Sequence, residues 1–208
     1  MVKVSGPMMS MAASGTLADT ITFASWKGRP YVRERVIPSN PKSGAQTGRR
    51  SMFSFLTKNW TDVTGADITS WQDIADQIVA SPFNAYLRQN MQGWHNFLSP
   101  MQNQAATRVG TPSDNALTSC DYEENRIKLS IAGSALGDAW GIAIFANKAT
   151  MSAAPTVADC IMVLPDTTIA AHVEYWTPPE VTTWYFDTIC FADDGAQAAV
   201  GGEDNAAP

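Results

Sequence analysis

The residues of this chain that could do chemistry are few, and their spacing fits none of the common catalytic arrangements. There are two histidines, His95 and His172, and three cysteines at positions 120, 160 and 190. His172 and Glu174 match the start of the zinc deaminase signature, but no P-C-x-x-C follows to complete the ligand set. The cysteines lie forty and thirty residues apart, which suits neither a zinc site nor a disulfide framework. We therefore predict reduced, buried cysteines and no catalytic residue, metal site or cofactor.

The short motifs of nucleotide, hydrolase and metalloprotease sites are also missing from the sequence. It contains no G-x-x-x-x-G-K-[ST], no G-x-G-x-x-G after a strand, no G-x-S-x-G and no H-E-x-x-H. The acidic pairs Asp193-Asp194 and Glu203-Asp204 belong to a Gly/Ala-rich tail, so we interpret them as solubilising charges and not as a calcium loop. The apolar runs are short and interrupted, which predicts neither a membrane span nor a secretory signal. What remains is a protein that works by binding.

Charge divides the chain into two parts. The 208 residues carry a net charge of −6, yet residues 1–108 hold eleven Lys or Arg against six Asp or Glu, and residues 109–208 hold three against fourteen. Half of the basic residues fall in one segment that contains a single acid, Glu34: Lys27, Arg29, Arg33, Arg35, Lys42, Arg49 and Arg50. Opposite signs predict two modules and head-to-tail contact between copies. The acidic total and the lack of a recognition motif do not favour nucleic acid as the partner.

The N-terminal region predicts a β-hairpin followed by an extended arm, over residues 1–44. Residues 20–23 alternate and predict a strand, Gly28-Arg29-Pro30 predicts a turn, and residues 31–36 predict the returning strand. The segment 37–41 holds two prolines in four residues, and each proline biases the preceding residue toward extended backbone. An arm is expected there.

Helical periodicity over residues 45–102 predicts a small helical domain. Met52, Phe53, Leu56 and Trp60 recur at steps of three and four and predict the buried face of the first helix. Thr69 and Gln72 match a capping box, which predicts the start of a second helix at Thr69. Ser81-Pro82 predicts the start of a third helix, extending to Pro100. The polar stretch 103–115 is expected to be a linker.

The pattern then changes to alternation, which predicts an antiparallel β-sandwich over residues 116–195 and an acidic, mobile tail over 196–208. Five segments predict strands separated by turn residues: 126–131, 140–145, 161–164, 170–176 and 184–191. The run 185–195 resembles the penultimate strand of fibronectin type III-like domains, in which a tyrosine, here Tyr185, forms a corner hydrogen bond. The expected fold class is α+β: an N-terminal hairpin and arm, a small helical domain, and an immunoglobulin- or fibronectin-like sandwich.

The hairpin and arm also resemble a group of proteins. A K-G-x-x-Y-x-R pattern begins at Lys27, and an N-P-x-[ST]-x-x-Q-x-x-x-R pattern begins at Asn40 and ends at Arg50. This order is similar to the N-terminus of phage- and prophage-encoded structural proteins, over roughly residues 12–98. The resemblance implies a structural role in the virion, after synthesis in the host cytoplasm, with other copies of the chain and other virion proteins as partners.

The expected partner-binding residues lie in the hairpin, the arm and the first helix, with Trp26 as a candidate anchor at the hairpin tip. They are Trp26, Lys27, Tyr31, Arg33, Asn40, Pro41, Gln46 and Arg50. Two other roles stay open from the sequence. One is a cell-surface or carbohydrate-binding module that meets a host surface through the sandwich, and the other is a nucleic-acid packaging or scaffolding protein that uses the basic segment.

Overall fold

The computed structural model describes residues 2–3, 14–37, 39, 43–110, 112, 117–131, 139–150, 155–165, 172–198 and 204–208. The chain divides into two compact units, Met1–Pro41 and Lys42–Pro208. Each unit is described by itself. In the described part of the chain, no helix is long and apolar enough to cross a membrane.

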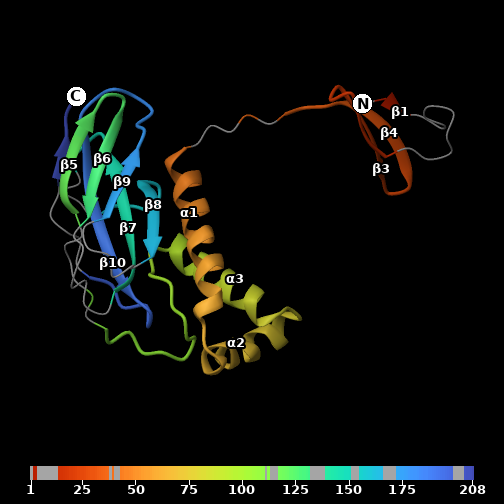
Figure 1. Ribbon diagram of the computed structural model, residues 1–208. Coiled ribbons are helices and arrows are strands. Elements are labelled where there is room, and N and C mark those ends of the chain that lie inside the picture. Colours follow the sequence, from red (N-terminus) through yellow and green to blue (C-terminus); the bar gives the residue numbers. More distant parts are fainter. Residues whose placement is uncertain are drawn as a thin grey trace. The chain divides into compact units, whose positions relative to one another are not determined.

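The first unit is a four-stranded antiparallel sheet in the order β1-β4-β3-β2 (Figure 1). Its strands are β1 (Val2–Lys3), β2 (Gly15–Leu17), β3 (Ile21–Trp26) and β4 (Arg29–Glu34). β3 and β4 form the predicted hairpin, but the turn is Lys27-Gly28 and not Gly28-Arg29-Pro30. Both turn residues have positive φ, 49° and 74°, as a two-residue hairpin turn that follows the twist of its strands requires.

The second unit contains a seven-stranded antiparallel sandwich. One sheet has the order β5-β6-β9 and the other β11-β10-β7-β8, which is a fibronectin-like arrangement of three strands on four (Figure 1). The strands are β5 (Leu117–Glu123), β6 (Arg126–Ile131), β7 (Ala139–Asn147), β8 (Cys160–Pro165), β9 (His172–Trp176), β10 (Trp184–Ala192) and β11 (Asp204–Ala206). Apolar side chains from both sheets fill its interior, among them Ile127, Leu129, Ile144 and Phe186.

The three helices form a layer on the outer face of the four-stranded sheet, with α1 against β8 and α2 against α3, so the unit has three layers (Figure 1). They are α1 (Gly44–Asn59), which a 3₁₀ turn at Trp60–Asp62 extends, α2 (Gly65–Ile78) and α3 (Pro82–His95). Met52, Leu56, Trp71 and Trp94 of the helices share one buried cluster with strand residues such as Phe145, Ile189 and Phe191. The helices and the sandwich therefore have a common core.

α1 packs closely against β8 (Figure 1). Gly48 makes this approach possible, because a Cβ at that position would lie 2.7 Å from the carbonyl oxygen of Cys160. Val163 donates its backbone N–H to Ser51 Oγ over 2.6 Å. β8 is an edge strand of its sheet, so a helix side chain here satisfies a backbone group that sheet pairing leaves open.

Residues 99–110, which overlap the predicted linker 103–115, instead form a strap that hydrogen bonds fasten to the rest of the unit. Trp71 Nε1 donates to the Gln102 carbonyl (2.6 Å), and the Gln102 N–H donates to the Asp193 carbonyl (2.7 Å). The N–H groups of Val109 and Gly110 both donate to Asp194 Oδ2 at 2.7 Å. The helical segment and the sandwich are thus parts of one unit, which differs from the predicted division.

Several predicted details are confirmed and others are wrong. Ser81 caps α3 as predicted, by accepting from the Asn84 N–H (3.3 Å). The capping box at Thr69 is wrong, because α2 begins four residues earlier, where Thr64 donates to Asp67. α3 ends at His95, before the predicted Pro100.

Two further corrections concern burial. Phe53, predicted in the core, is 49% exposed, and Phe55 is buried in its place. The predicted mobile tail is also wrong in part, since it contains β11, which pairs with β10 and buries Ala206.

Candidate functional site: one face of the N-terminal sheet

The register of the hairpin collects the expected binding residues on one side of the N-terminal sheet. Trp26 lies opposite Arg29, Ala24 opposite Tyr31, and Thr22 opposite Arg33. Directly opposed residues point to the same face of an antiparallel pair, and alternate positions along a strand share that face. We call Trp26, Arg29, Tyr31 and Arg33 the basic–aromatic face.

Trp26 dominates this face. Its side chain is 66% exposed, and the ammonium group of Lys27 lies 4.8 Å from its ring centroid. The other six tryptophans are buried or packed against a core: Trp60, Trp71, Trp94, Trp140, Trp176 and Trp184. Trp26 is therefore the one exposed tryptophan among the described residues.

The guanidinium groups of this face lie without an acidic partner among the residues that the structure describes. In the described part of the chain, neither Arg29 nor Arg33 forms an ion pair, and both side chains are exposed. The face therefore carries uncompensated positive charge next to an exposed indole, an arrangement that suits an acidic surface.

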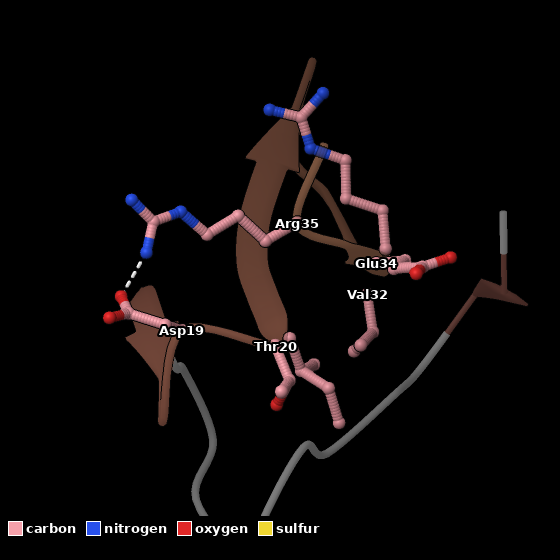
Figure 2. Close-up of a pocket in the computed structure, with 7 residues that line it drawn as sticks. Asp19, Thr20, Val32, Glu34 and Arg35 are labelled. Carbon is pink, nitrogen blue, oxygen red and sulfur yellow. Dashed lines mark hydrogen bonds and ion pairs between the residues drawn. The ribbon is translucent and has the colours of Figure 1, made fainter. Parts of the chain in front are cut away.

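The opposite face of the same sheet is apolar at its centre. Phe23 lies opposite Val32 and is half-buried, while Leu17 and Ile21 are 45% and 38% exposed. A shallow hollow with Ile21 and Val32 in its lining lies on this side, and Figure 2 shows Asp19 and Arg35 paired at its rim. No histidine, cysteine or serine lines this hollow, so it has no nucleophile or general base of those types.

The structure brings together only some of the predicted site residues. Trp26, Lys27, Tyr31 and Arg33 lie together in the N-terminal sheet. Asn40 and Pro41 lie outside the described residues. Gln46 and Arg50 are exposed one turn apart on α1, in the other unit, and the exposed Phe53 continues their stripe.

Arg29 is the member of the face that the sequence interpretation missed. Assigning Gly28-Arg29-Pro30 to the turn removed it from the strand. The signal that could have placed it is the Lys27-Gly28 pair between two alternating runs, because glycine is favoured in a two-residue hairpin turn with positive φ.

The groups considered for catalysis have other roles in the structure. The exposed His95 accepts a hydrogen bond at Nδ1 from Arg49 Nη2 (2.9 Å), in a groove without a carboxylate or thiol in its lining. All three cysteines are free and buried as predicted, and burial raises the pKa of the Cys160 thiol to about 12. Among the described residues, no group of three or more potential ligands could hold a metal ion. The side chain of His172 lies outside the described residues.

Asp194, considered for a calcium loop, organises the strap. It accepts from the N–H groups of Ala196 (2.8 Å), Val109 and Gly110. Burial acts to raise the pKa of Asp194, but these backbone hydrogen bonds and the nearby Arg108 charge outweigh it and hold the pKa below its ordinary value.

Comparison with known proteins adds two structural likenesses. No family model matches the chain. No curated protein matches it either. A fibronectin type III-like protein from Clostridium thermocellum is similar over 47% of this chain and 93% of its own, with 15% identity and a TM-score of 0.34. The spore cortex lytic enzyme SleM from Clostridium perfringens is similar over 46% of this chain and 28% of its own, with 15% identity and a TM-score of 0.32. Likenesses of this size carry no argument about function.

Proposed function

We propose that this chain is a non-enzymatic structural component of a bacteriophage particle, which it joins through its N-terminal sheet. The candidate positions in the particle are capsid decoration, the connector and the tail. The observation that carries the assembly role is the contrast in burial between the units. None of residues 14–37 of the first unit is buried, whereas the second unit closes its own core.

A small sheet without a buried side chain gains little stability by itself, because isolated strands need an apolar face packed on something else. Such an element can gain buried area by packing on a neighbour. Trp26 suits the centre of that contact, since aromatic and arginine side chains carry much of the binding energy of interfaces. The phage context comes from the resemblance of the hairpin and arm, and is part of the proposal.

The alternative role is surface recognition by the sandwich, and one observation favours it. On the outer face of the sheet β5-β6-β9, Tyr175 is 45% exposed and the Arg126 guanidinium lies 4.0 Å from its ring centroid. Carbohydrate platforms use exposed aromatic rings, but Trp176 and Trp184 of this domain point into its core. The N-terminal sheet therefore has the stronger case.

The test compares two matched double variants. Trp26→Ala with Arg33→Glu changes the basic–aromatic face, and Tyr175→Ala with Arg126→Glu makes the same kinds of change on the sandwich. Both variants should melt near the wild-type temperature. Copies per particle, counted in purified particles, should fall to background for the first variant and stay at the wild-type number for the second. Full incorporation of the folded first variant would refute the proposed role of the sheet, and loss with the second would favour the sandwich.

A further inference from the structure

The basic–aromatic face needs an acidic surface, and the charge distribution of the second unit shows where one lies. The first unit carries five Lys or Arg and two Asp or Glu, and the second carries nine and eighteen. In residues 60–80, which include α2, there are four aspartates and no lysine or arginine: Asp62, Asp67, Asp73 and Asp76. α2 itself holds three of them, Asp67, Asp73 and Asp76, and is the acidic one of the three described helices.

The outer side of α2 is open. Trp71 and Ala75 form its buried side, and α2 packs against α3. Asp73 and Asp76 are exposed on the other side, and neither forms an ion pair within the described part of the chain. At the end of the helix, Val79 is 95% exposed. We call Thr69, Asp73, Asp76 and Val79 the acidic stripe.

Several acidic groups elsewhere in the described part of the second unit have a counter-charge or a structural partner nearby. Glu123 pairs with Lys128 at 3.5 Å, and Glu180 pairs with Lys148 at 2.5 Å. Asp194 accepts three backbone hydrogen bonds in the strap. The outer face of the three-stranded sheet mixes Asp121 with Arg126 and Lys128. In the acidic stripe, Asp76 accepts a hydrogen bond from Gln72 Nε2 (2.6 Å), but neither Asp73 nor Asp76 has a cationic partner among the described residues, so two like charges lie together without a counter-charge.

We infer that the basic–aromatic face of one copy docks on the acidic stripe of a second copy. This inference rests on the proposed assembly function and names the partner surface. Arg29 and Arg33 lie about 13 Å apart along their strand, and Asp73 and Asp76 about 4.5 Å apart along their helix, so the two long arginine side chains must converge to reach the pair. Arg29 and Arg33 meet Asp76 and Asp73, and the exposed ring of Trp26, beyond Arg29 at the hairpin tip, covers Val79.

The contact is heterologous, because the two surfaces belong to different parts of the chain. A copy bound through its sheet still presents its own acidic stripe to the next copy. Repetition closes into a ring or continues as a filament, according to the rotation between neighbours. The charges steer the encounter and fix the register, while the indole provides the apolar area.

Charge reversal of the full-length chain tests this contact. Sedimentation velocity is measured over a concentration series at low salt, where the Debye length is about 30 Å at 0.01 M. The wild type should sediment faster as its concentration rises. Arg29→Glu with Arg33→Glu, and separately Asp73→Lys with Asp76→Lys, should each weaken this association about a hundredfold or more. Asp121→Lys with Glu124→Lys is the control with a matched charge change, and it should behave like the wild type.

Restoration is the sharper part of the test. All four reversals in one chain should recover association, and so should an equimolar mixture of the two double variants. A wild type that stays monomeric overturns the inference. The inference is also overturned if the chain with all four reversals associates but the mixture of the two double variants does not. That result would mean that the two surfaces meet within one copy. If the arginine reversals weaken association and the aspartate reversals do not, the acidic stripe is not the docking site, while the proposed function stands. Binding of single-stranded DNA by the wild type then tests nucleic acid as the acidic partner.

Discussion

The chain contains two four-stranded antiparallel sheets that meet opposite environments. In the sheet β11-β10-β7-β8, strand β10 is buried on both faces, one against the other sheet and one against the helices, and eight of its nine residues are buried. In strands β2, β3 and β4 of the sheet β1-β4-β3-β2, no residue is buried. The same secondary structure therefore serves as a core in one unit and as a surface in the other. The difference shows in sequence as a mostly apolar run in β10, interrupted by the buried Asp187 and Thr188, and as basic residues at both ends of the alternation in β4.

The largest expected effect is at the shared core of the second unit. Phe191 of β10 is fully buried, and its ring lies edge-on to Phe55 of α1 and Trp140 of β7, with centroids 5.5 and 6.2 Å away. Phe191→Ala should lower the free energy of unfolding by about 3–5 kcal/mol. Urea titrations followed by helix circular dichroism and by tryptophan fluorescence should shift together. Separate transitions would mean that the helices and the sandwich are independent domains.

A smaller effect is expected where α1 meets β8. Gly48→Ala places a methyl group 2.7 Å from the Cys160 carbonyl and 2.9 Å from the Cys160 Cβ, so the helix must move away from the strand. The expected loss in unfolding free energy is about 1–3 kcal/mol. Gly65→Ala is the control, because nothing lies within 4 Å of the methyl group that it adds. If the two variants are equally stable in urea, there is room for the added methyl group between α1 and β8.

The strap gives a pH-dependent effect. The pKa of Asp194 is lower in the folded state than the value of about 3.8 in the unfolded chain. The ionised carboxylate therefore stabilises the fold fully above pH 3.8, and this stabilisation is lost as the pH falls through the lower pKa of the folded state. Asp194→Asn should cost about 1 kcal/mol at pH 7, and the difference from wild type should shrink toward pH 3. Asp193→Asn, an exposed neighbour, is the control. A difference that stays constant with pH would mean that the charge of Asp194 contributes nothing to folding.

Much of the second unit could be predicted because its local signals agree with its packing. The Ser81-Pro82 cap and the alternation of β6, β7 and β10 each report on nearby residues. The failures came from contacts distant in sequence. The strap looked like a linker because its polar residues gave no periodicity, and they are ordered by hydrogen bonds to residues more than thirty positions away, such as Asp194 and Trp71.

The candidate site was predictable in part for the same reason. Trp26, Tyr31 and Arg33 were found from composition and from the hairpin pattern. Arg29 was missed by a turn placed one residue too far along the chain, and a shift of one position moves a side chain to the other face of a sheet. The predicted corner hydrogen bond of Tyr185 has no counterpart among the described residues, where the ring packs toward the helices. The tyrosine pattern gave no sign of the helical layer.

The smallest expected effect on stability comes from removing the first unit altogether. A chain of residues 42–208 keeps every buried side chain of the shared core and of the sandwich interior, because all of them lie after Pro41. Its free energy of unfolding should be within about 0.5 kcal/mol of the full chain, which is the usual range for changes outside a core. Urea unfolding of the two chains, with the Phe191→Ala variant as the reference for a large loss, measures this. A loss above about 2 kcal/mol would mean that the sheet stabilises the same protomer, and its faces could then no longer be treated as free for assembly. If the free energy of unfolding is unchanged and the shortened chain is absent from particles, the second unit is responsible for folding and the first for attachment.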